Sequence, residues 1–151
     1  MRRRWEAVSA AVGVLLALVV LAGAAFAVNQ ANGRSYKGGL LPATRGISVS
    51  FEVSGSGKQV SSLTISNIPL YCSGGGPAIP VHFKNASISS QGAFTSSAQN
   101  IIKIGPLEGQ VGEKLKITGK FLRGRREQGT LTTVYPKAPA CGGKSPYTTK
   151  A

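Results

Sequence analysis

The chain has 151 residues and a formal net charge of +13, because 18 lysines and arginines face only five acidic residues, all of them glutamates. This length suits one ordinary domain, and a single histidine with two cysteines leaves few residues for acid–base or metal chemistry. The positive electrostatic field of such a protein attracts nucleic acids, anionic glycans, phosphate polymers and anionic lipid surfaces. Positive charge can also have no role other than keeping a protein soluble.

The N-terminal residues predict export. Three arginines, Arg2 to Arg4, precede the apolar block 12–21, and Ala25 and Ala27 supply small residues at the alternate positions that signal peptidase accepts. We therefore expect a signal peptide over residues 1–27, a short spacer over 28–34 and a single domain over 35–151. The predicted location is secreted or extracytoplasmic.

A retained anchor is the alternative for this segment. The uncharged stretch 7–28 reaches the ~20 residues that can span a bilayer, which exceeds an ordinary signal core. If it stays uncleaved, this transmembrane helix is the one predicted attachment to a membrane. If it is removed, 15 basic and 4 acidic residues remain, a formal charge of +11.

From Ser35 onward the pattern is that of β-strands. Apolar residues at 47, 49, 51 and 53 alternate with serine and glutamate, which predicts a half-buried strand. The turn 55–58 then reverses the chain, and residues 60–68 form the next strand, which Leu70-Tyr71-Cys72 extends. Shorter strands are expected at 81–83 and 93–96.

A second clean strand lies in the C-terminal half. Leu115, Ile117, Gly119 and Phe121 alternate with three lysines and a threonine, so one face is buried and the other is wet. Residues 123–129 are predicted as a polar turn, after which residues 130–135 pair back as a hairpin. In total, seven or eight short strands predict an all-β domain, either an antiparallel β-sandwich or a partly open barrel.

The two cysteines, Cys72 and Cys141, are expected to form a structural disulfide, because an even pair in an exported chain is typical of one. Closing a loop of about 70 residues stabilises a fold by about 4 kcal/mol in the chain-entropy model. A metal site would need more thiols or histidines than His82 and two distant cysteines supply.

The order of several short motifs resembles an uncharacterised family of small secreted bacterial β-sandwich proteins with one disulfide. The resemblance covers about Ser35 to Ala151, although tryptophan is commoner in that family where Tyr147 stands. It implies a β-sandwich, a closing strand and no assigned activity. The motifs, in chain order, are Tyr36-Lys37-Gly38, Ile47 to Val53, Leu70-Tyr71-Cys72, Gly92-Ala93-Phe94, Ile117 to Phe121, Gly129-Thr130-Leu131, Cys141-Gly142-Gly143 and Tyr147 to Ala151.

Candidates for catalysis are few. His82 is the only histidine, and its place in Val81-His82-Phe83 is typical of a strand-face residue rather than of a base. Glu108 and Glu113 could form a carboxylate pair for glycoside cleavage, but their neighbours indicate loop and strand surface. Glu52 and Glu127 complete the acid–base candidates. We therefore predict no enzymatic activity, no cofactor and no metal; an enzyme with an unrecognised site stays as an alternative.

The basic residues suggest a surface for polyanions. Period-two alternation sends three lysines of the strand outward, and three arginines follow in the adjoining turn, countered nearby only by Glu113 and Glu127. We predict a non-catalytic binding module for an anionic envelope polymer, glycan or lipid surface; a purely structural envelope protein is the other alternative. The predicted binding residues are Lys114, Lys116, Lys120, Arg123, Arg125 and Arg126.

Overall fold

The computed structural model describes residues 32–42, 46–69, 78–102 and 108–151. These residues form nine β-strands and one short 3₁₀ turn, with no α-helix among them. The elements are β1 (Ser35–Leu40), β2 (Ser48–Val53), β3 (Gln59–Pro69), β4 (Ala78–His82), β5 (Ala86–Ser87), β6 (Ala93–Ile101), β7 (Val111–Leu122), β8 (Arg126–Val134), η1 (Pro139–Cys141) and β9 (Gly143–Lys150).

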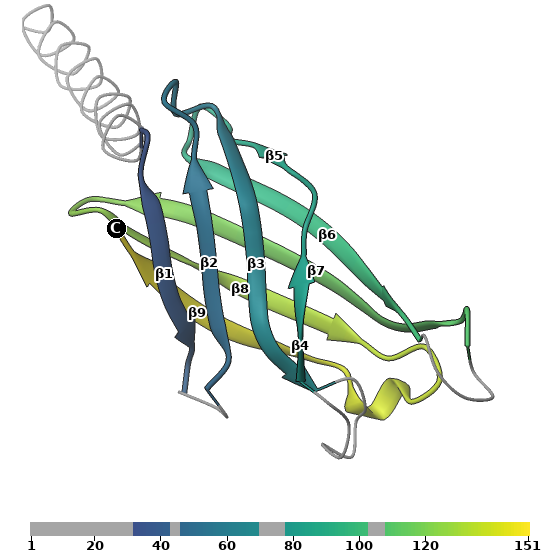
Figure 1. Cartoon of the computed structure of the whole chain (residues 1–151). Coiled ribbons are helices and arrows are strands. Elements are labelled where there is room, and N and C mark those ends of the chain that lie inside the picture. The colour runs from purple at the N-terminus through teal and green to yellow at the C-terminus, as the bar shows by residue number, and fades with distance from the viewer. Residues whose placement is uncertain (1–31, 43–45, 70–77, 103–107) are drawn as a thin grey trace, which may run out of the picture.

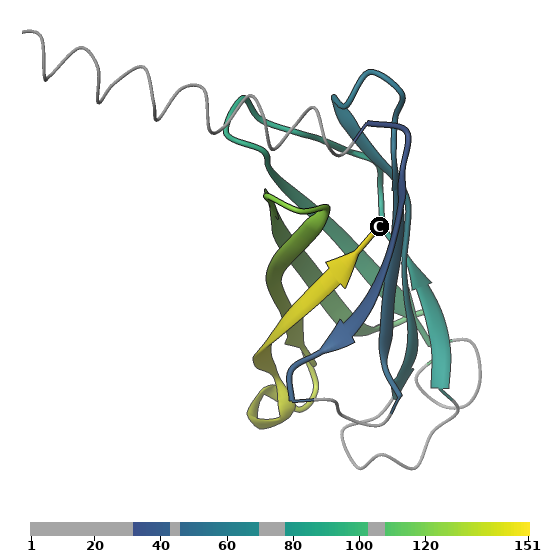
Figure 2. The same ribbon diagram turned by 90° about the vertical axis from the view of Figure 1, so that its left-hand side faces the viewer.

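All the strands belong to one antiparallel sheet that curls into a nearly closed barrel (Figures 1 and 2). The strand order is β4-β3-β2-β1-β9-β8-β7-β6, with β5 attached to β3. The first and last strands of the domain, β1 and β9, pair with each other and join its two halves. The open seam lies between β4 and β6, where the Ser96 hydroxyl donates a hydrogen bond of 2.6 Å to the Lys84 carbonyl.

The all-β prediction is confirmed, and of the two expected architectures the structure has the barrel rather than the sandwich. Eight strands make the wall, but several are longer than expected; β7 has 12 residues. The predicted turn 123–129 is also wrong in extent, since Leu122 already pairs with Arg126. Gly124 and Arg125 adopt positive φ angles of 75° and 58°, which closes this hairpin within three residues.

Aromatic rings from opposite walls fill one end of the barrel. Tyr36 of β1 stacks on Phe51 of β2 with ring centroids 5.0 Å apart, and Phe121 of β7 meets the Tyr36 ring edge-on at 5.3 Å. Phe94 of β6 lies 5.8 Å from Phe121. Such aromatic pairs contribute stabilising energy in addition to that from the apolar area they bury. The inward residues of the alternating strands thus form one packed core.

Glycines on the inner face make room for larger side chains. Gly129 of β8 lies between Gly119 of β7 and Tyr147 of β9 in register. A Cβ atom at Gly129 would lie 2.6 Å from both Cε1 and the hydroxyl of Tyr147, and one at Gly119 would collide with Glu127 Oε1. These two glycines therefore create the space in which the Tyr147 ring and the Glu127 carboxylate lie.

Candidate polyanion-binding surface and buried carboxylates

All six predicted binding residues are exposed on the outside of the barrel. The structure divides them into two groups. The three lysines, Lys114, Lys116 and Lys120, stand on the outer face of β7, as the alternation predicted. Arg123 and Arg125 lie in the β7–β8 turn, and Arg126 is the first residue of β8.

The two expected counter-charges of this surface are absent from it. Glu113 and Glu127 are 0% and 1% exposed, because their positions on β7 and β8 face the barrel interior. The expectation that Glu113 belongs to a strand surface was therefore wrong. Across β6 to β9, all of whose residues the structure describes, no side-chain carboxylate is exposed. We call the outer face of these four strands the basic wall.

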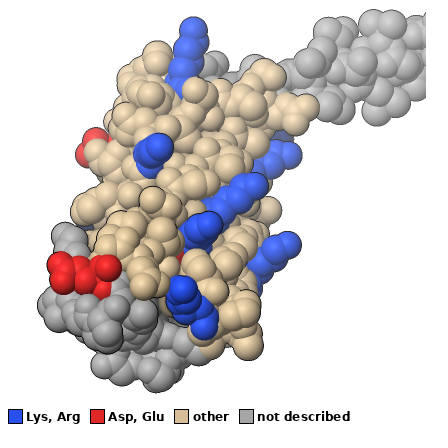
Figure 3. Space-filling model, turned by 90° about the vertical axis from the view of Figure 1, so that its right-hand side faces the viewer, with Lys and Arg blue, Asp and Glu red and all other residues tan. Residues whose placement is uncertain are grey.

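The basic wall contains a groove beside the seam. Its volume is about 820 Å³, and its lining includes Lys84, Lys114 and Lys116 together with the polar side chains of Asn85 and Gln99. In Figure 3, lysine and arginine side chains follow one another diagonally across one face of the molecule, with the acidic side chains mainly toward its left-hand margin. The groove thus offers ammonium and amide donors together.

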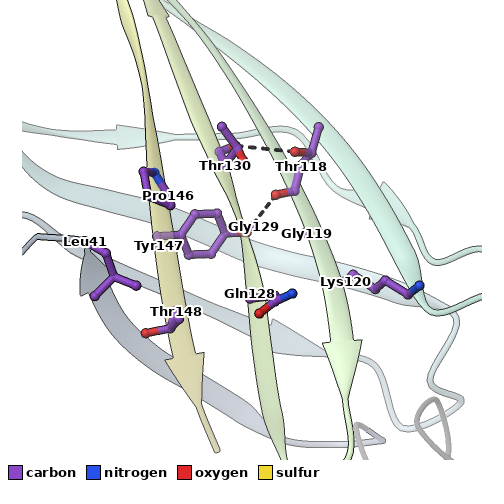
Figure 4. A pocket seen from close by; sticks show the side chains of 10 residues that line it. All are labelled: Leu41, Thr118, Gly119, Lys120, Gln128, Gly129, Thr130, Pro146, Tyr147 and Thr148. Carbon is purple, nitrogen blue, oxygen red and sulfur yellow. Dashed lines mark hydrogen bonds between the residues drawn. The ribbon is translucent and has the colours of Figure 1, made fainter.

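A second groove crosses β7, β8 and β9, above the inner-face glycines (Figure 4). Its volume is about 480 Å³, and five of its ten lining residues are threonine, glutamine or lysine. Lys120 stands at one side and Leu41 at the other, while the Tyr147 ring lies across Gly129 beneath the strands. This groove is rich in hydroxyl groups rather than in charge.

Sequence reasoning missed three exposed lysines that strand pairing brings to this surface, namely Lys144 and Lys150 on β9 and Lys37 on the adjacent strand β1. Lys37 of β1 pairs with Lys150 of β9, which pairs with Arg126 of β8, so three exposed cations stand side by side on adjacent strands. Lys144 pairs with Thr132 farther along β9. No local pattern signals this arrangement, because β1 and β9 are more than 100 residues apart in the sequence.

Inside the barrel, Glu127 lies in a cage of hydroxyl groups. The Tyr147 hydroxyl donates to Glu127 Oε1 and the Thr149 hydroxyl to Oε2, both at 2.7 Å. Burial raises the pKa of Glu127 to about 7, and the two hydroxyl donors offset only part of that rise. Burial also raises the pKa of Tyr147, with a further contribution from the charge of Glu127.

Glu113 occupies a second buried position. Asn100 Nδ2 donates to Glu113 Oε2 at 3.0 Å, whereas Oε1 has no hydrogen-bond partner among the described residues. Burial raises the pKa of Glu113, and hydrogen bonds from Tyr135 and Asn100 offset part of that rise. Burial and the neighbouring Glu113 raise the pKa of Tyr135 to about 12. These two carboxylates are structural residues of the interior rather than partners of the outer cations.

The Tyr147 hydroxyl gives a first test of the interior. In Tyr147→Phe, Glu127 Oε1 loses its donor, so the pKa of Glu127 should rise further and the free energy of unfolding at neutral pH should fall by about 1–2 kcal/mol. Urea unfolding at several pH values measures both effects. An unchanged stability would contradict the assigned hydrogen bond.

The remaining sequence candidates do not come together. His82 is an exposed strand-face residue whose Nδ1 lies 3.0 Å from the Thr64 hydroxyl, and Glu52 and Glu108 are exposed. In the part of the chain that the structure describes, no cluster of three or more His, Cys, Asp or Glu residues could hold a metal ion. Glu108 and Glu113, the carboxylates considered as a pair for glycoside cleavage, lie in different environments, since Glu113 is buried and Glu108 is exposed.

Two predictions lie outside the described residues. Cys141 ends η1 directly before β9, but Cys72 is not described, so the disulfide stays a prediction. The export segment, with Ala25 and Ala27, is likewise not described. Among the described residues, no helix has the length and hydropathy of a membrane span.

No family model matches the chain, and no curated protein or solved structure shows significant similarity to it. Function must therefore follow from the arrangement of its own side chains.

Proposed function

We propose that this protein is a secreted or envelope-associated, non-catalytic binding module whose basic wall holds a linear phosphate polymer. The observation that carries the proposal is the segregation of charge between the two faces of β6 to β9. Cations occupy the outer face, and both glutamates of these strands are buried in the interior. A one-signed surface of this kind concentrates anionic partners and steers their approach.

The geometry of β7 supports a linear partner. Outward residues of a strand recur about every 6.8 Å, so Lys114, Lys116 and Lys120 form a line of about 20 Å. The groove beside the seam adds Lys84 to this line. A flexible chain with regularly spaced phosphates can engage several of these ammonium groups at once, whereas a small anion can engage only one or two.

The aromatic residues argue against single-stranded nucleic acid as the partner. Proteins that bind it combine a basic groove with aromatic side chains on which the bases stack. All seven aromatic residues that the structure describes are buried in this barrel. The basic wall therefore offers charge and hydrogen-bond donors but no stacking surface, which favours a polymer without bases.

Binding to long-chain polyphosphate tests the proposal. If the wall engages roughly four phosphates, the slope of log affinity against log salt should be about −3, and affinity should fall ~50-fold between ~50 and ~200 mM salt. The double variant Lys114→Glu with Lys116→Glu should reduce affinity at least about tenfold at ~100 mM salt and halve this slope. Fluorescence anisotropy with labelled polyphosphate measures both quantities.

The matched control reverses two exposed lysines outside the wall. Lys58 lies in the β2–β3 turn and Lys137 follows β8, so Lys58→Glu with Lys137→Glu changes net charge by the same amount. This control should retain most of the affinity. Equal losses in the two double variants would show that net charge alone attracts the polymer, and binding absent at low salt would leave solubility as the role of the basic residues. Tighter binding of dextran sulfate or of anionic vesicles would replace the phosphate polymer by a glycan or a lipid surface.

A further inference from the structure

We infer that the row Lys37, Lys150 and Arg126, which we call the cation row, is a discrete site for a tetrahedral oxyanion such as phosphate. The inference deepens the proposed polymer binding, on which it rests for the class of partner, and it assigns a site that the line of lysines on β7 does not include. Its basis is the register of three strands rather than the overall charge. Lys150 lies directly opposite Lys37 on one side and Arg126 on the other.

Such a row is unfavourable without a ligand. Residues directly opposite on antiparallel strands have Cβ atoms about 5 Å apart, and like charges at such positions destabilise the sheet. The row continues into Ser50 on β2 and Leu122 on β7, so no carboxylate stands directly opposite its members. The exposed Glu52 of β2 lies two residues from Ser50, diagonal to Lys37 at the edge of the row. A bound oxyanion would convert this repulsion into attraction.

The cation row has a further cation beside it in the sequence. Arg125, exposed in the β7–β8 turn, immediately precedes Arg126. The Ala151 amide donates to the Arg125 carbonyl at 3.0 Å and so holds the end of β9 against the β7–β8 turn. Glu127, which follows Arg126 in the sequence, is buried on the opposite face of β8.

The donor set suits phosphate or sulfate. A guanidinium group presents a planar fork that binds two oxygens of one oxyanion, and the ammonium groups supply point charges beside it. Arg126 can provide the fork while Lys37 and Lys150 approach the remaining oxygens from neighbouring strands. An isolated carboxylate would use fewer of these donors.

The test compares a lysine of the cation row with an exposed lysine outside the basic wall. Lys150→Gln removes the central member of the cation row, whereas Lys58→Gln removes an exposed lysine of the β2–β3 turn, with the same change in net charge. In chloride buffer at low ionic strength, Lys150→Gln should raise the midpoint of thermal unfolding by about 2 °C, and Lys58→Gln should not. Replacing chloride with inorganic phosphate at constant ionic strength should raise the midpoint of the wild type and of Lys58→Gln. This rise should be less than half as large in Lys150→Gln.

Three outcomes would overturn the inference. In the first, phosphate raises the unfolding midpoint equally in all three proteins. In the second, both variants lose the same share of the rise that phosphate causes in the wild type. In the third, phosphate does not change the midpoint of the wild type. Because the probe is inorganic phosphate and Lys150 lies outside the β7 line, these results are independent of the polyphosphate measurements on Lys114 and Lys116. A comparison of inorganic phosphate with polyphosphate on Lys150→Gln then shows whether the row takes a free anion or a phosphate group within a chain.

Discussion

The free energy of unfolding should fall as the pH rises from about 4.5 to about 8, by about 3 kcal/mol from Glu127 alone. Burial raises the pKa of this carboxyl from 4.5 to about 7 in the folded state, whereas the unfolded chain retains the ordinary value. Between these two values the folded protein binds the proton and the unfolded chain does not, so stability decreases with pH. The contribution is complete below about pH 4.5 and is lost as the pH passes through 7.

Glu127→Gln isolates this effect. The amide stays neutral at every pH, can accept from Tyr147 and can donate to Thr149, so the cage is kept. The variant should match the wild type near pH 4 and exceed its stability by about 3 kcal/mol at pH 8. Denaturant unfolding across this pH range measures the difference.

Burial also raises the pKa of Glu113, so this residue adds to the pH dependence of both proteins. Subtracting the pH profile of the wild-type unfolding free energy from that of Glu127→Gln removes this shared contribution. Glu52→Gln, which removes an exposed carboxylate of β2, serves as the matched control and should run parallel to the wild type. A constant gap between Glu127→Gln and the wild type at all pH values would contradict a carboxyl that titrates inside the barrel.

Gly129→Ala should destabilise the barrel by about 3 kcal/mol, although it adds only one methyl group. The new Cβ would collide with the Thr118 carbonyl and lie 2.6 Å from the ring and hydroxyl of Tyr147. Backbone cannot yield as a flexible side chain does, so relief requires β7, β8 or the Tyr147 ring to shift. Thermal or urea unfolding measures the loss.

The matched control is Gly143→Ala on β9. A Cβ at Gly143 meets no atom within 4 Å, and the change reduces the entropy of the unfolded chain, so stability should stay the same or rise by about 0.5 kcal/mol. Similar losses in both variants would attribute the effect to glycine replacement in general. A Gly129→Ala protein as stable as the wild type would contradict the close packing of Tyr147 over β8.

Local alternation was enough to predict much of the fold. Val49, Phe51 and Val53 are buried and Glu52 is exposed, as the period of two required, and the three lysines of β7 are exposed for the same reason. The prediction works because each strand of this barrel has one wet and one dry face, so burial follows position along the strand. The β7–β8 hairpin was also predictable, since its two strands are adjacent in sequence.

Glu113 and Glu127 show where this reasoning failed. Both carboxylates occupy inward positions of the same alternation that buries Leu115 and Leu131, yet their charge suggested surface. Their burial depends on Asn100, Tyr147 and Thr149, which other strands bring to them. A buried acid is tolerable only with such partners, and residues 13 to 22 positions away supply them.

The sequence by itself determined the all-β class, the faces of the principal strands and the basic character of the surface, because these depend on residue type and on a two-residue period. Only the tertiary structure decided that the sheet closes as a barrel, that two of the acids lie inside it, and that Lys37, Lys150 and Arg126 form one row. The pairing of β1 with β9 joins the two halves of the sheet and brings Lys37 beside Lys150, whereas the buried acids depend on partners from β6 and β9. Pairing between the ends of a chain depends on the whole sheet curling on itself, and no local sequence pattern specifies it.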